Sequence, residues 1–156
     1  MGYTHYFPQH RDFTDQEWET LCKVCHLLMD KAEEAGIVIV NWDGKAGTKP
    51  EIEFDEGVIC FNGEGEDSHE SMVLTKVQTW EDWQDKNEPP FAFCKTAQKP
   101  YDTIVTALLG AAHVIAKGAL VVTSDGDFEE WQPGLELAEQ VLHLKSGLFK
   151  PALIGK

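Results

Sequence analysis

The chain has 156 residues, of which 42% are hydrophobic and 26% are charged, and its 27 acidic and 13 basic residues give a formal net charge of −14. This length and apolar content suit one domain with a hydrophobic core, so we expect a single domain over residues 1–156 rather than a disordered chain. A surface this acidic repels phosphate groups, which argues against direct nucleic-acid binding and against binding to an anionic membrane.

The N-terminal sequence MGYTHYF lacks the basic region and apolar run of a signal peptide, and no apolar run in the chain is long enough to span a bilayer. We therefore expect a cytoplasmic protein whose cysteines are free thiols. Residues 22–26 read CKVCH and match the haem-attachment motif C-x-x-C-H. Both cysteines fall on the apolar stripe of a predicted helix, so we expect core thiols there and no cofactor.

The first forty residues predict a strand, a helix and a second strand. Aromatic residues in the segment 2–7 are typical of a strand. Thr14 and Glu17 form a capping box, the apolar residues that follow recur at helical spacing, and Gly36 is expected to end the helix. The β-branched run at residues 37–40 predicts a short buried strand.

The middle of the chain predicts a hairpin and a further strand. Apolar and acidic residues alternate over residues 51–55, and a tight turn at 55–57 leads into an apolar run at 58–61. A polar acidic loop at 62–70 then precedes a strand at 72–77. Mostly antiparallel pairing is therefore expected.

The most apolar segment follows an irregular connection at residues 78–90. Residues 100–117 are apolar on nearly every face of a helix, so this helix should be the most buried one. Residues 120–123 form a β-branched run that predicts the last strand.

A final helix is expected near the end of the sequence. Asp127 and Glu130 could cap it, but the Pro-Gly pair at 133–134 predicts a break, so we expect the regular part to start there and to run past Lys145 to Gly147. The order β-α-β-β-β-β-α-β-α predicts an α+β fold, with one mostly antiparallel sheet and about three helices packed on it.

The run FCKTAQKPYD at residues 93–102 is the best chemical clue in the sequence. Lys95 and Lys99 stand just before Pro100, a residue typical of the first turn of a helix. A helix N-terminus presents free backbone N–H groups and a partial positive charge, and the lysines would add to it. This pattern indicates a site for an anion, although proline itself removes one N–H donor.

The opening MGYTHYF, the FCKT…PYD block and the SDG…W segment at residues 124–131 resemble a family of small proteins encoded by bacteriophages and prophages. These proteins open with the same MGYTHY string, and the similarity spans most of the chain. The family brings no settled activity or catalytic assignment. The resemblance implies a phage-type origin, and small phage proteins often act as accessory factors against host defence.

The resemblance brings together eight residues that could form one polar pocket where the first strand meets the start of the buried helix. In this interpretation basic side chains hold phosphate or carboxylate, hydroxyl and backbone donors add hydrogen bonds, and a tyrosine stacks on a base. The alternative is that these side chains pair internally and support the fold. The predicted ligand-binding residues are Tyr3, His5, Arg11, Lys95, Thr96, Lys99, Tyr101 and Asp102.

The sequence assigns no catalytic residue and no metal ligand. Its six histidines show no tight ligand spacing, and residues 125–127 (Asp-Gly-Asp) are more typical of a turn. Cys94 is the one candidate nucleophilic thiol because the cation of Lys95 would lower its pKa, but its apolar neighbours argue for burial. The chain has no G-x-S-x-G, P-loop or Rossmann pattern, which counts against an enzyme.

Acidic side chains concentrate in residues 51–88. They could form a solvated surface, or a surface that docks on a basic host protein with Trp80 and Trp83 as anchors. Three functions follow in order of preference. The first is a non-enzymatic phage-type accessory protein that binds a small anionic or nucleotide-like ligand. The second is an acidic protein–protein inhibitor, and the third is a small hydrolase of a phosphorylated substrate. A homo-oligomer stays open.

Overall fold

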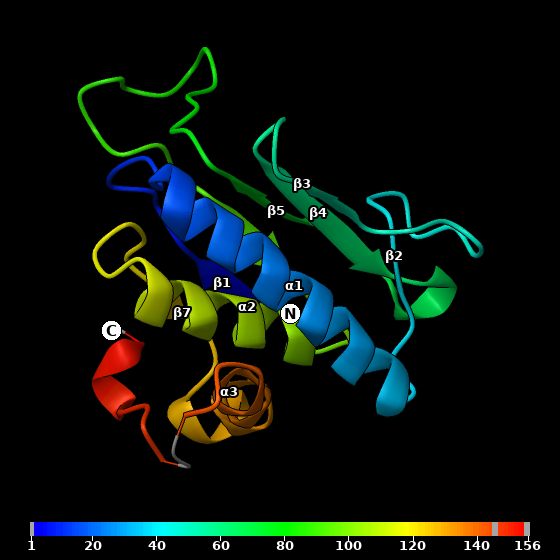
Figure 1. Ribbon diagram of the computed structural model, residues 1–156. Coiled ribbons are helices and arrows are strands. Elements are labelled where there is room, and N and C mark those ends of the chain that lie inside the picture. The colour runs from blue at the N-terminus through cyan, green and yellow to red at the C-terminus, as the bar shows by residue number, and fades with distance from the viewer. Residues whose placement is uncertain (1, 145–146, 155–156) are drawn as a thin grey trace.

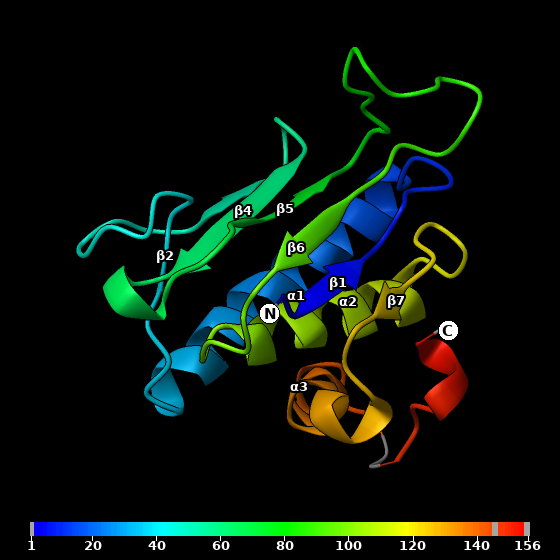
Figure 2. The same ribbon diagram turned by 180° about the vertical axis from the view of Figure 1, so that it is seen from behind.

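The strands form two antiparallel sheets that share one helix-covered face (Figures 1 and 2). The computed structural model describes residues 2–144 and 147–154. The first sheet has the order β6-β1-β7, with its strands at Thr4–Tyr6 (β1), Phe93–Lys95 (β6) and Thr123–Ser124 (β7). The pairs β1–β6 and β1–β7 are both antiparallel.

The second sheet is built around β4 (Val58–Gly63), which pairs with each of the other three strands. These are β2 (Ile39–Val40), β3 (Glu51–Glu53) and β5 (Met72–Thr75). The β3–β4 hairpin confirms the predicted turn, and Gly57 in that turn has a φ of 69° that suits glycine. Glu70 links the two sheets, since its backbone N–H donates to the Lys95 carbonyl at 3.1 Å.

Helices α1 (Asp15–Glu34) and α2 (Asp102–Ile115) pack on the same side of the sheets, and α3 (Phe128–Val141) packs against α2 (Figure 1). The capping box predicted at Thr14 and Glu17 is present, and α1 ends just before Gly36. Helix α2 is the predicted buried helix, with nine of its 14 residues buried. Two short 3₁₀ turns, Gly65–Asp67 and Pro151–Leu153, complete the elements. The fold is therefore α+β, as predicted.

Helix α3 begins earlier than expected and passes through Pro133. Asp127 and Glu130 form a complete capping box, which fixes the start of the helix one turn before the proline. Pro133 is exposed, as is Glu129, whose carbonyl would otherwise accept the missing N–H, so water can satisfy that group. The helix ends at Val141, short of the predicted Gly147, and the predicted helical position Lys145 lies outside the described residues.

Strand β6 was not expected, and β7 lies later than predicted. Residues 93–95 are too few to show a clear alternation, and their pairing with β1 is made across about ninety residues of chain. At residues 120–123, only an isolated bridge between Leu120 and Gln9 precedes β7. The connection at residues 78–90 is irregular, as predicted.

The two faces of the sheets differ in composition. Residues directly opposite one another in an antiparallel pair point to the same face. The pairs His5–Cys94 and Ile59–Leu74 point to the helices and are buried. The face that Figure 2 shows in front of the helices carries Phe93, which is 41% exposed. This face has no helix over it.

Within the described part of the chain, no helix combines the length and the apolar character needed to cross a membrane.

The close approach of α3 to α2 depends on Gly134. A Cβ at this position would overlap the Thr106 side chain and come within 2.7 Å of the Thr103 carbonyl oxygen. We predict that Gly134→Ala lowers the free energy of unfolding by about 1–3 kcal/mol, despite the better helix propensity of alanine. Urea unfolding measures this change.

Gly110→Ala is the matched control for this prediction. A Cβ at Gly110 meets the end of the flexible Leu135 side chain at 2.8 Å, which can shift, so the loss should be smaller. If Gly134→Ala is at least as stable as the wild type, the packing argument is wrong.

Candidate functional site

A buried hydrogen-bond network lies where β1 and β7 meet the start of α2. The His5 side chain is fully buried, and both of its ring nitrogens have partners. Its Nε2 lies 2.6 Å from Asp102 Oδ1, and its Nδ1 lies 2.7 Å from Ser124 Oγ. An ionised carboxylate only accepts, so Nε2 carries the proton that is donated to Asp102.

Ser124 connects this network to the start of α3. Its Oγ accepts hydrogen bonds from the Gly126 N–H at 2.9 Å and from the Trp131 Nε1–H at 3.1 Å. Both lone pairs of the hydroxyl oxygen are then used, so its own proton points to His5 Nδ1. The indole ring of Trp131 also packs edge-on against the imidazole, with ring centroids 5.0 Å apart.

Asp102 receives a second hydrogen bond at the same oxygen. Thr96 Oγ1 donates to Asp102 Oδ1 at 2.6 Å, and Thr96 is fully buried. Asp102 is the first residue of α2, so its negative charge also offsets the positive end of the helix dipole. The internal carboxylate therefore occupies the place that the sequence assigned to an external anion.

The order Ser124–His5–Asp102 resembles the hydrogen-bond relay of serine hydrolases, but the geometry does not suit catalysis. A nucleophilic serine must reach a substrate carbonyl, and a catalytic imidazole must reach the leaving group. His5 is fully buried, Ser124 is only 8% exposed, and the Ser124 oxygen is engaged by two N–H donors. The relay therefore joins four elements of the fold and leaves no open approach for a substrate.

Tyr3 lies at the edge of this network. Its ring stands edge-on to His5 at 5.2 Å between centroids, and its hydroxyl packs against Gly126, where any Cβ would overlap it. Among the described residues this hydroxyl makes no hydrogen bond, although the Gln98 amide approaches it. Burial, and then the charges of Asp102 and nearby carboxylates, raise the pKa of Tyr3.

The turn before α2 does not present the free amides that the anion hypothesis needs. The Asp102 N–H donates to the Lys99 carbonyl at 2.8 Å, and the Thr103 N–H donates to the Pro100 carbonyl at 3.3 Å. Lys95 and Lys99 are exposed, and the Lys95 ammonium lies 5.8 Å from the Phe93 ring centroid. The first-turn N–H groups are therefore satisfied within the chain.

Tyr101 is a core residue in this structure and cannot stack on a ligand from where it lies. Its side chain is fully buried, and its hydroxyl donates to the Glu70 carbonyl at 2.5 Å. Burial, and then the neighbouring Cys94, raise the pKa of Tyr101.

Arg11 lies at the far end of α2 from the two lysines. Its guanidinium binds both carboxylate oxygens of Glu17, at 2.8 and 3.0 Å, and donates to the Lys117 carbonyl, which follows the last turn of α2. A helix of this length spans about 21 Å, so Arg11 and Lys95 do not share a pocket. The structure brings together Tyr3, His5, Thr96 and Asp102 from the predicted set, and it separates Arg11 and Tyr101 from them.

The cysteines lie in the core. Burial, and then the charge of Glu53, raise the pKa of Cys22 to about 11, and burial also raises the pKa of Cys25. Cys94 was the candidate nucleophile, but burial, and then the charge of Glu70, raise its pKa instead of lowering it. No group of three or more metal-binding side chains occurs among the described residues.

The open face of the sheets carries a second candidate site, which we call the outer-face patch. The rings of Tyr6, Phe91 and Phe93 form a row, with centroids 6.0 and 5.4 Å apart along it. Trp83 is 76% exposed beside them. The patch comprises Tyr6, Val73, Trp83, Phe91 and Phe93, and its last four members line a hollow of about 370 Å³.

Acidic side chains surround the outer-face patch. Residues 51–88 hold twelve acidic residues and two lysines. Glu81 lines the hollow, and Glu51 shares the open face because it stands opposite Cys60, which stands opposite Val73. The exposed acids Asp82, Asp85 and Glu88 lie in the same connection as Trp83.

No protein-family model, no curated protein and no solved structure matches the chain. The participation of Ser124 and Trp131 in the His5 network could not be deduced from spacing, because the Ser124–His5 contact joins residues 119 positions apart. The resemblance had singled out the segment that contains both residues, and this was the one available signal.

We predict that Ser124→Ala lowers the free energy of unfolding by about 2–3 kcal/mol, because it leaves His5, Trp131 and the Gly126 N–H without their shared oxygen. Ser68→Ala is the control, since the Ser68 hydroxyl donates only to the Gly65 carbonyl in an exposed loop and water can replace it. That change should stay within about 0.5 kcal/mol. Equal stability of both variants in urea unfolding would show that the network contributes nothing.

The Arg11–Glu17 pair should make stability depend on pH. The hydrogen bonds from Arg11 lower the pKa of Glu17 from 4.5 to about 2. Because the folded pKa lies below the unfolded one, the stabilisation is present above about pH 4.5 and is lost as the pH falls towards 2. We predict that Arg11→Gln costs about 1 kcal/mol at neutral pH, allowing for solvent screening, and that this cost shrinks below pH 4.5.

Lys23→Gln is the control for this pH dependence. Lys23 pairs with Glu19 at 3.2 Å on the same helix, but both side chains are more than half exposed. Its effect should be smaller than that of Arg11→Gln and nearly independent of pH. A cost of Arg11→Gln that is unchanged between pH 7 and pH 3 would contradict the proposed coupling.

Proposed function

We propose that the protein is a non-enzymatic accessory protein that docks on a basic protein through the outer-face patch. The observation that carries this proposal is a row of exposed aromatic rings beside a hollow, on a sheet face that has no helix over it and that acidic residues surround. This proposal gives the second of the three sequence-based functions priority over the first.

Aromatic side chains support a docking role because they are the residues that most often anchor protein interfaces. Tyr and Trp bury large areas at a low cost in side-chain entropy, and hot spots of binding cluster where such rings meet a pocket. Trp83 and Phe91 stand at the hollow and are 76% and 47% exposed. Their exposure costs solvation free energy in the free protein, and a partner that covers them would recover it.

The charge of the surrounding surface supports a basic partner. Twelve acidic residues and two lysines in residues 51–88 favour association with a positively charged surface and disfavour an acidic one. Arginine and lysine side chains of the partner could also stack on the exposed rings, as Lys95 does on Phe93 within the chain. The resemblance to small phage and prophage proteins supports a host protein as the partner.

Small-anion binding at Lys95 and Lys99 has less support. The first-turn amides of α2 are satisfied, Asp102 places a negative charge there, and Arg11 is bound to Glu17 elsewhere. Hydrolysis has less support as well, because the Ser124–His5 pair is buried. A binding role that uses the exposed surface fits these features better than either alternative.

We predict that Trp83→Ala combined with Phe91→Ala weakens binding to the basic partner by about 2 kcal/mol or more, the size of a hot-spot loss. Affinity purification of the tagged protein from host cells identifies the partner, and titration with the purified partner measures the change. Wild-type binding should also weaken as salt is raised.

Trp42→Ala is the matched control, because Trp42 is a second exposed tryptophan, at 59%, outside the outer-face patch. This variant should bind like the wild type. If Trp42→Ala weakens binding as much as the double variant does, or if the partner is acidic, the proposed surface is wrong.

A further inference from the structure

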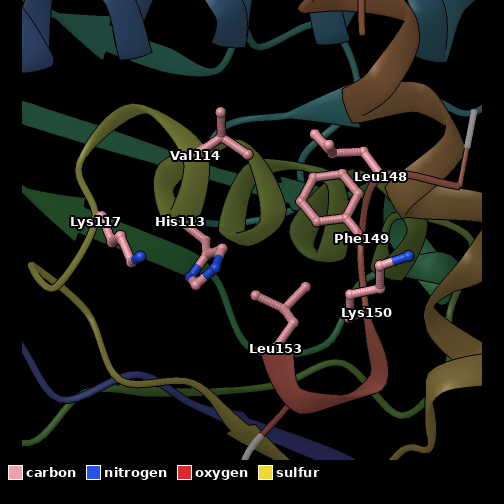
Figure 3. A pocket seen from close by; sticks show the side chains of 7 residues that line it. All are labelled: His113, Val114, Lys117, Leu148, Phe149, Lys150 and Leu153. Atoms are coloured by element: carbon pink, nitrogen blue, oxygen red, sulfur yellow. The ribbon is translucent and has the colours of Figure 1, made fainter. Parts of the chain in front are cut away.

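A groove at the C-terminal end of α2 carries a different set of side chains from the rest of the surface. It has a volume of about 380 Å³ and lies between the end of α2 and the segment that precedes and enters the last 3₁₀ turn (Figure 3). Its lining residues are His113, Val114, Lys117, Leu148, Phe149, Lys150 and Leu153. Three of these seven side chains are basic and none is acidic, in a chain with a net charge of −14.

The groove is held open by contacts outside its lining. The carboxylate of Glu139 on α3 accepts a hydrogen bond from the Leu148 N–H at 2.9 Å. Phe149 is only 7% exposed and packs over Gly110, where an added Cβ would lie 3.5 Å from the Phe149 ring. These two contacts hold residues 148–150 against α2 and leave Leu148 and Val114 exposed, at 45% and 39%.

The positive charges at the groove are available to a ligand. Within the described residues, neither Lys117 nor Lys150 has a carboxylate within 4.0 Å, whereas Arg11, which touches the Lys117 carbonyl, is neutralised by Glu17. Burial, and then the charge of Lys117, lower the pKa of His113, so the two ammonium groups supply the charge near pH 7.

The lining also limits the chemistry of the ligand. Apart from the three basic side chains, every lining side chain is aliphatic or aromatic, so no amide, hydroxyl or carboxylate side chain is present to recognise a sugar or a nucleobase. Four apolar side chains beside two ammonium groups match a molecule with an alkyl tail and one negative head group. The volume falls at the small end of ligand pockets.

We propose that this groove binds a medium-chain aliphatic carboxylate, with its tail against Val114, Leu148 and Leu153 and its carboxylate between Lys117 and Lys150. The groove lies at the opposite end of α2 from the His5 network and is lined by none of the residues of the outer-face patch. This inference is therefore independent of the docking function proposed above.

The test uses decanoate as the probe and titration calorimetry as the measurement. The wild-type protein should bind decanoate saturably and should not bind acetate, which has the charge but no tail. Lys117→Gln combined with Lys150→Gln should weaken decanoate binding by about tenfold or more. Val114→Asp, which places a carboxylate on the exposed wall of the groove, should also weaken it.

Lys49→Gln combined with Lys86→Gln is the matched control, because both lysines are exposed and lie outside the groove while the change in net charge is the same. This control should bind decanoate like the wild type. The proposal is overturned if the wild type shows no saturable binding at millimolar decanoate, if acetate binds equally well, or if the Lys117/Lys150 variant binds decanoate as tightly as the control.

Discussion

The buried imidazole of His5 is the contact on which the arrangement of the chain most depends. It joins β1 to the start of α2 through Asp102 and to β7 through Ser124, and Ser124 extends the connection to α3 through Trp131. These residues are 97 and 119 positions from His5 in the sequence. A buried imidazole with both nitrogens paired is costly to disrupt, since any lost partner leaves another polar group unsatisfied.

This network also accounts for the way the surface is divided. Residues that point from β1 and β6 towards the helices are used for the core and the network, so their neighbours on the strands must point outward. Tyr6 and Phe93 are such neighbours, and they become part of the outer-face patch. The same chain segments therefore build the rigid interior and present the aromatic rings, which gives the proposed docking surface a fixed shape.

Local patterns predicted the parts of the fold that depend on local physics. The capping box at Thr14 and Glu17 placed α1, the acidic–apolar alternation placed the β3–β4 hairpin, and continuous apolar character identified α2 as the most buried helix. The start of α3 was missed because Pro133 was weighed as a break, whereas it sits on the solvent side and the capping box before it decides the start.

The candidate site was less accessible to prediction, because it depends on contacts between distant segments. The cluster of Tyr3, His5, Thr96 and Asp102 was expected through the resemblance, and the structure shows these residues together. The position of Arg11 could not be known, because it depends on which end of α2 the loop after β1 meets. Whether aromatic residues such as Phe91 are exposed likewise depends on the absence of a helix over that face, which no local pattern states.

The most direct test of the proposed docking surface is site-specific photo-crosslinking in living host cells. A photoreactive phenylalanine analogue would replace Phe91 in the outer-face patch or, in a parallel sample, Trp42 outside it. The account predicts that position 91 crosslinks to one basic protein and that position 42 does not. Crosslinks of equal yield from both positions, or a crosslinked partner that is acidic, would contradict it.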